Sequence, residues 1–122
     1  MLVNVRILIS MPSKGFTWAV PGVVIRVIDA DTMVIDLDTG WGNCRPRQIC
    51  RLLGVDTPEM KTIEGKAARE FVVGLVPLGT QVVFRSQRLD SFGRSLGTVQ
   101  LPDGTDLGHL LLVTGHGVEM RA

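Results

Sequence analysis

Short apolar runs separated by turn-forming residues fill most of this chain, and this pattern predicts a fold rich in strands. Residues 2–10 alternate between apolar and polar positions, which is typical of a strand with one buried face. Glycine, proline and aspartate mark the turns between the later runs. Five further strands are predicted, over Val23 to Ile28, Met33 to Leu37, Ile49 to Val55, Thr80 to Arg85 and Ser95 to Leu101.

The segments between these strands carry loop and helix signals. The polar, glycine-bearing stretch from Trp41 to Gln48 is interpreted as a long hairpin loop. A helix is predicted over Glu64 to Leu75, with Thr62 as its N-cap. Leu107 to Thr114 predicts a second, short helix stopped by Gly115. The inward positions expected on the first helix are Ala67, Ala68, Phe71, Val72 and Leu75.

The order of elements favours an α+β fold, a small barrel that carries helices, with an extra N-terminal strand. The length of 122 residues favours one domain over 1–122. The N-terminal strand could extend a sheet edge or pair with a second molecule, so both a monomer and a homodimer are expected possibilities.

Composition excludes some classes of function and leaves others open. Lys and Arg number 13 against 12 Asp and Glu, so the net charge is +1 and attraction to nucleic acid would have to come from local arginines. No apolar run approaches the ~20 residues that span a bilayer, so no membrane partner is expected. The N-terminus lacks a convincing signal peptide, which makes a cytoplasmic location the expectation while secretion stays open.

The two cysteines, Cys44 and Cys50, would lie about 20 Å apart on a continuous strand, too far for a disulfide. A bend at Pro46 would weaken that argument. We interpret both as reduced thiols.

The stretch from Arg51 to Glu59, RLLGVDTPE, sets one cation and two acids around an apolar strand that ends in a turn. Pro58 fixes its own φ and restricts Thr57 to an extended conformation, so the strand should stop there. Asp56 and Glu59 are then held at a rigid strand end. Such a set suggests a metal-assisted reaction on an anionic substrate, such as a phosphodiester.

Asp29 and Asp31 form a second acidic pair, two residues apart and therefore on one face if the strand continues through them. Asp31 together with Asp56 would supply hard oxygen ligands that suit calcium or magnesium. The alternative is that Asp29 to Asp31 is only a turn or bulge, and for this segment alone that interpretation is favoured.

Plain structural explanations also exist for the other candidates. Asp56 and Glu59 could form a capping turn before the helix, and Arg51 could be a solvated strand residue. Arg94 could be an ordinary hairpin arginine. The joint occurrence of these residues, in order and with compatible elements, is what favours chemistry.

Three segments together resemble the signatures of the staphylococcal nuclease (thermonuclease) family: VIDADT at 27–32, RLLGVDTPE at 51–59 and DSFGR at 90–94. The resemblance runs from about residue 23 to about residue 118. It implies an OB-type five-stranded barrel with helices and calcium-dependent hydrolysis of DNA and RNA. Magnesium or manganese would also fit a carboxylate site.

By matching position, the resemblance implies that Asp31 and Asp56 are the calcium-binding carboxylates. The backbone carbonyl of Thr57 would be a further ligand, and Asp29 would be an additional acid beside the metal.

The resemblance also assigns the catalytic groups. Glu59 would act as the general base or orient the attacking water, while Arg51 and Arg94 would bind the phosphate and stabilise the charge of the transition state. In the family the 5′ oxygen leaves, which gives 3′-phosphate products.

Several departures from the family concern substrate contacts. The lysine-rich loop is shortened here to residues 60–63, the last helix is expected to be absent, and Phe92 stands where the family usually has a tyrosine. Phe92 can stack on a base but has no hydroxyl. The hairpin over 38–48 is longer than expected and carries three residues that could replace these contacts, Trp41, Arg45 and Arg47. An exposed insertion with incidental arginines is the equal alternative.

Two functions follow as hypotheses. The first is a metal-dependent endonuclease that acts on DNA, RNA or both. The second is a non-catalytic nucleic-acid-binding or protein-interaction module on the same barrel, which the complete set of carboxylates and arginines disfavours.

Overall fold

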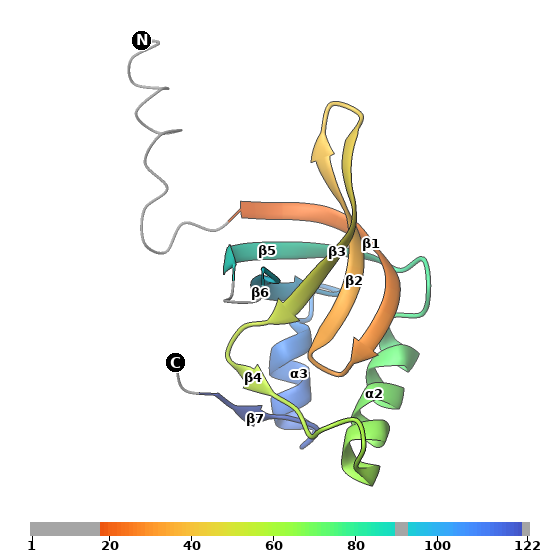
Figure 1. The fold of residues 1–122 in the computed structure, drawn as a ribbon, viewed down its shortest axis with the longest axis vertical. Coiled ribbons are helices and arrows are strands. Elements are labelled where there is room, and N and C mark those ends of the chain that lie inside the picture. The colour runs from red at the N-terminus through yellow and green to blue at the C-terminus, as the bar shows by residue number, and fades with distance from the viewer. Residues whose placement is uncertain (1–17, 90–92, 121–122) are drawn as a thin grey trace.

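The computed structural model describes residues 18–89 and 93–120, which are coloured in Figure 1. The strand predicted over 2–10, and the homodimer contact through it, lie outside the described residues. So does Phe92.

Five strands close into a barrel in the order β1-β2-β3-β6-β5 (Figure 1). Neighbouring strands are antiparallel except for β3 and β6, which run parallel. The strands are β1 (Trp18–Asp29), β2 (Thr32–Gly40), β3 (Asn43–Leu52), β5 (Gln81–Leu89) and β6 (Ser95–Gln100). This arrangement confirms the predicted five-stranded barrel of OB type.

The core fills the barrel and continues into two helices. Every second residue of β2 points inward because side chains alternate along a strand, and Met33 and Ile35 are almost completely buried. Helices α2 (Ile63–Leu75) and α3 (Leu107–Val113) add Val72 and Leu111 to the same core. Both helices lie at the end of the barrel that carries the β1–β2 turn (Figure 1).

Both predicted helices form close to their expected bounds. Thr62 is the N-cap of α2, and its hydroxyl oxygen accepts a hydrogen bond from the Gly65 N–H at 2.9 Å. Ala68 and Val72 are buried, but Ala67, which was predicted to face inward, is exposed because α2 meets the barrel through a narrow face. No helix in the described part of the chain is long and apolar enough to cross a membrane.

The long loop predicted over Trp41 to Gln48 is wrong, because β3 already begins at Asn43. Trp41 and Gly42 have φ values of 55° and 77°, and two consecutive positive values are typical of a tight type I′ hairpin turn. Residues 38–47 of β2 and β3 extend beyond the barrel, and we call this ribbon the arm (Figure 1). Residues 41–47 are all exposed, so the arm lacks the apolar alternation that identifies a half-buried strand.

The single strand predicted over Ile49 to Val55 is also interrupted. β3 ends at Leu52, and Gly54 adopts a φ of 81°, which glycine adopts at no steric cost. β4 (Val55–Asp56) follows and pairs with β7 (Val118–Glu119) in a separate two-stranded sheet. Asp56 therefore lies on a short strand next to the barrel. β4 ends at Asp56, just before Thr57 and Pro58, as predicted.

The first barrel strand is longer than predicted, because β1 starts at Trp18 and pairs with β5 through residues 18–23. Pro21 is tolerated there because β1 pairs with β2 only from Gly22 onward, so no ladder partner is lost on that side.

Candidate active site

Segments distant in the sequence meet at the helix-bearing end of the barrel. Asp31 lies in the turn between β1 and β2, which is bound to the end of β3 because the Leu52 N–H donates to the Asp31 carbonyl oxygen at 2.8 Å. Thr32 and Arg51 are directly paired across β2 and β3. Asp29 is the last residue of β1, Ala30 and Asp31 form the turn, and this turn brings Asp31 to Arg51.

Arg51 joins the two carboxylates that were predicted to bind metal. Its Nη2 atom lies 3.3 Å from Asp31 Oδ2 and 3.4 Å from Asp56 Oδ1. The Arg51 and Asp31 side chains are 14% and 7% exposed, whereas that of Asp56 is 56% exposed. One side of the cluster is therefore buried in the barrel wall, and the Asp56 side opens to solvent.

Asp31 is held as a carboxylate by its neighbours. Burial opposes its ionisation, yet its pKa is lowered because the hydrogen bond with Asp29 and the charge of Arg51 favour the ionised form. The Thr32 hydroxyl donates to Asp31 Oδ1 at 2.9 Å, and the Thr57 N–H donates to Oδ2 at 3.3 Å. Both hydrogen bonds also lower the pKa of Asp31.

Asp29 has the opposite electrostatic environment. Burial, together with its hydrogen bond to Asp31 and the charge of Asp31, raises the pKa of Asp29 to about 6. Its Oδ1 atom is buried and has no hydrogen-bond partner among the described residues. An oxygen in this state is stabilised by a proton or by a cation, so its environment fits a positively charged ligand.

Glu59 is anchored through its backbone while its side chain stays on the surface. Its carbonyl oxygen accepts hydrogen bonds from the Thr62 N–H at 3.0 Å and the Thr62 hydroxyl at 2.6 Å. A Cβ atom at Gly65 would overlap that same carbonyl oxygen, so helix α2 packs directly against it. The Glu59 carboxylate forms an ion pair with Lys61 at 3.2 Å, and both side chains are mostly exposed.

Arg94 immediately precedes β6 and is partly buried. The parallel pairing of Cys50 with Ser95 and of Arg51 with Leu96 brings this segment beside the strand that carries Arg51. The topology thus brings the two predicted phosphate-binding arginines to neighbouring strands.

The three arm residues predicted as substrate contacts lie on the far side of the barrel from α2. Trp41 is at the exposed tip of the arm, up to roughly 30 Å along β2 from Asp31 at ~3.3 Å per residue. Arg47 has a φ of 50° and donates its N–H to Asp36 Oδ1 at 2.7 Å, which fixes a bulge in the arm. The structure does not bring Trp41 or Arg47 to the carboxylates.

The cysteines are both free, as expected, with Cys44 exposed and Cys50 buried. Burial raises the pKa of Cys50 to about 12, so its thiol remains protonated at neutral pH.

A cavity of about 220 Å³ lies beside Asp56 and Thr57 and is also lined by His116. The imidazole of His116 stacks on Phe71, with ring centroids 4.5 Å apart. Sequence reasoning did not single out His116, because an isolated histidine after a helix carries no motif.

The oxygen donors fit a hard divalent cation. Asp31 and Asp56 provide two carboxylates next to one another, the Thr57 carbonyl is on the adjacent residue, and Asp29 adds a buried oxygen without a partner. Within residues 18–89 and 93–120, no group of three or more His, Cys, Asp or Glu side chains is gathered around one point. Water or substrate would therefore have to complete a coordination shell here.

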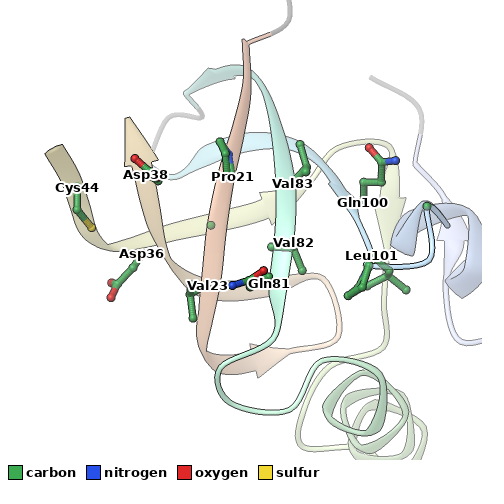
Figure 2. Close-up of a pocket in the computed structure, with 13 residues that line it drawn as sticks. Pro21, Val23, Asp36, Asp38, Cys44, Gln81, Val82, Val83, Gln100 and Leu101 are labelled. Atoms are coloured by element: carbon green, nitrogen blue, oxygen red, sulfur yellow. The ribbon is translucent and has the colours of Figure 1, made fainter. Parts of the chain in front are cut away.

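A larger groove, of about 780 Å³, lies on the outer surface of β1, β2 and β5 (Figure 2). It contains none of the predicted catalytic residues. Asp36 and Asp38 line it on the β2 side, and these acids would repel a phosphate backbone.

Residues 49–121 match the family model described as staphylococcal nuclease homologue. The chain is 33% identical over 105 residues to an uncharacterized endonuclease of Escherichia coli O157:H7, which covers 82% of this chain and 64% of that protein. It is 36% identical over 87 residues to a thermonuclease of Staphylococcus hyicus, covering 64% of this chain and 47% of that protein.

A third similar protein is Protein ParB of Escherichia coli, 35% identical over 83 residues, with 67% of this chain and 43% of that protein covered. The chain spans less than two thirds of the length of each of these relatives. Family match, barrel topology and motif positions agree, and the chain belongs to the staphylococcal nuclease family.

Proposed function

We propose that this chain is a metal-dependent nuclease that hydrolyses phosphodiester bonds in DNA, RNA or both. The observation that carries the proposal is the convergence of Asp31, Arg51 and Asp56 from separate segments at one place, in a chain of this family. A structural ion pair needs only one carboxylate per arginine, whereas Arg51 contacts two, and the buried Asp29 interacts with one of them, Asp31.

Asp31, Asp56 and the Thr57 carbonyl would hold the cation, with Ca²⁺ as the first expectation and Mg²⁺ or Mn²⁺ as alternatives. A bound dication supplies positive charge against the phosphate oxygens and lowers the pKa of a bound water. The lowered pKa of Asp31 favours this role, because a ligand carboxylate must be ionised.

Arg51 and Arg94 would bind the phosphate and stabilise the charge that develops during cleavage. Arginine remains charged at any working pH, and its planar group matches two phosphate oxygens at once. Arg51 already touches both carboxylates, so a phosphate bound beside these acids is within its range.

Glu59 would accept a proton from the attacking water. It must leave Lys61 to do so, and this costs little because an exposed ion pair contributes only about 0–1 kcal/mol. The anchored backbone at Thr62 keeps the Glu59 side chain within a limited range of positions.

Glu59→Gln tests this proposal, because it keeps the size of the side chain and removes the base. Digestion of plasmid DNA and of single-stranded RNA would be followed with calcium, magnesium, manganese or chelator. We expect cleavage by the wild type only with a divalent cation, and turnover lower by about 10²–10⁴ in Glu59→Gln. Undiminished cleavage in chelator would refute metal dependence, and full activity of the variant would refute the role of Glu59.

One observation favours the alternative of a nucleic-acid-binding module without catalysis. Arg51 balances both carboxylates, and the Glu59 side chain is engaged by Lys61 rather than by the cluster. Binding of oligonucleotides without cleavage under any of the metals above would establish this alternative.

A further inference from the structure

The end of the barrel away from α2 and α3 is the end from which the arm extends (Figure 1). A cavity of about 350 Å³ lies at this end, and we call this cavity the mouth. All five barrel strands contribute to its lining. Its polar and aromatic members are Trp18 of β1, Thr39 of β2, Arg45 and Gln48 of β3, Ser86 of β5 and Ser95 of β6.

These side chains form a defined chemical set. Trp18 is 59% exposed and offers a large aromatic surface, and it is directly paired with Ser86 across β1 and β5. Gln48 provides an amide and the serines provide hydroxyls, which can both donate and accept hydrogen bonds. Val20, 7% exposed, contributes an apolar surface at the base. No acidic residue occurs among the described residues that line the mouth, and Arg45 makes its rim cationic.

The mouth shares strand β3 and the start of β6 with the segments that carry Arg51 and Arg94. β3 and β6 pair only over Cys50–Leu52 and Ser95–Gly97, and the arm continues beyond that point without a β6 neighbour. Ser95 directly follows Arg94. Gln48 precedes Arg51 by three residues, about 10 Å at ~3.3 Å per residue. A strand whose phosphate lies between the two arginines therefore has the mouth roughly 10 Å away.

We propose that the mouth binds a nucleobase of the strand whose phosphate is held at Arg51 and Arg94. The base stacks on Trp18, its polar edge meets Gln48 and the serines, and Arg45 contacts a neighbouring phosphate. The volume lies in the range of small-molecule sites. A base can enter only when it is unpaired and unstacked, so this site selects single-stranded segments. The inference rests on the proposed function, because that function makes nucleic acid the occupant.

The larger groove of Figure 2 is a poorer site for nucleic acid. Asp36 and Asp38 from β2 line it, and no arginine or lysine occurs among its described lining residues. Because the groove is acidic and the mouth is cationic, we assign the binding of nucleic acid to the mouth.

The test measures binding in chelator, so that no cleavage is required. A labelled single-stranded oligonucleotide is compared with the same sequence carrying an abasic site at each position in turn. Trp18→Ala removes the stacking surface, and Ser86→Leu fills the mouth without removing an aromatic group. Leu78→Ala, at an exposed position in the α2–β5 connection, is the matched control. Thermal unfolding of each variant verifies its fold.

We expect Trp18→Ala and Ser86→Leu each to weaken binding by about 5-fold to more than 100-fold, the range for loss of one stacked base. An abasic site at one position should weaken the wild type by a similar factor and have little further effect on the two variants. Leu78→Ala should bind as the wild type does.

Wild-type binding that is absent, or the same for intact and abasic strands at every position, would overturn the inference. So would variants that weaken the binding of intact and abasic strands equally. A wild type that distinguishes the abasic strand but cleaves nothing with any metal would leave the mouth assignment standing and refute the nuclease.

Discussion

Arg51 is the residue on which the candidate site depends most directly, because it supplies the positive charge between two carboxylates. With a cation bound, the same carboxylates gain a second source of positive charge, so Arg51 and the cation partly substitute for each other. This relation makes a measurement possible that does not depend on activity.

Arg51→Ala is expected to lower the free energy of unfolding in chelator by about 1–3 kcal/mol, since the almost buried Asp31 loses its charged partner. Added calcium should stabilise the variant more than it stabilises the wild type, because the cation restores the missing charge. Urea unfolding with chelator or calcium measures both effects. Arg26→Ala, at an exposed arginine of β1, is the control. Equal calcium stabilisation of all three proteins would contradict the assignment of Asp31 and Asp56 as ligands.

Asp29 gives a pH dependence of defined sign. Its pKa rises from 3.8 to about 6 on folding, mainly through burial, so the folded state binds the proton more tightly than the unfolded state. Its contribution to stability is therefore lost as the pH rises from about 4 through about 6. An asparagine side chain has nearly the shape of the protonated aspartic acid and does not ionise, so the Asp29→Asn variant does not lose this stability.

In chelator, Asp29→Asn should therefore be more stable than the wild type at pH 7.5, and the difference should shrink as the pH falls from about 6 to about 4. Urea unfolding at a series of pH values measures it. A difference that does not vary with pH would show that Asp29 ionises normally in the folded protein.

Among the helices and strands, some features could be predicted from the sequence and others could not. The caps and bounds of α2 follow from local signals, because Thr62 and the apolar spacing act within a few residues. The arm and the break at Gly54 were not predicted. The arm is exposed on both faces, so its sequence does not alternate between apolar and polar residues as a half-buried strand does. The break at Gly54 depends on the positive φ of one glycine, and this glycine stands inside a run that is otherwise apolar.

At the level of elements, the junction between the 57–59 segment and α2 is sensitive to a single methyl group. Gly65→Ala would push the Glu59 carbonyl away, whereas Gly74→Ala in the same helix meets open space. We expect Gly65→Ala to destabilise the protein by about 1–3 kcal/mol and to lower kcat more than it raises KM. Gly74→Ala should stabilise by about 0.5–1 kcal/mol and leave the kinetics unchanged. Identical kinetics for the two variants would exclude a positioning role for this junction.

The whole molecule is nearly neutral, with a net charge of +1, so its affinity for nucleic acid depends on where a few arginines lie. The residues proposed for catalysis could be singled out in the sequence because they occur in linear motifs. The residues of the mouth other than Arg45 could not, because they come from five strands and meet only when the barrel closes. A fold-level site of this kind leaves no local pattern in the sequence.

Because only a few arginines are available, the binding of nucleic acid should depend only weakly on salt concentration. If Arg45, Arg51 and Arg94 make the main phosphate contacts, log K should fall with log salt with a slope of about −2, from ~0.7 per contact on a single strand. Arg45→Gln should make the slope shallower by about 0.7, and Arg26→Gln should leave it unchanged. Titrations of an oligonucleotide at several salt concentrations in chelator provide the slopes, and a much steeper wild-type slope would indicate a larger cationic surface.

The pairing of β4 with β7 has a consequence for the order in which the protein forms. Val55 lies opposite Glu119, Asp56 lies opposite Val118, and the Met120 N–H donates to the Gly54 carbonyl at 3.0 Å. A ribosome synthesises the chain from its N-terminus, so Asp56 emerges long before the strand that supports it. We expect the nascent barrel to contain Arg51 and Asp31 in place while Asp56 is still unsupported. The candidate site would then acquire its second carboxylate only after β7 has been synthesised and has paired with β4.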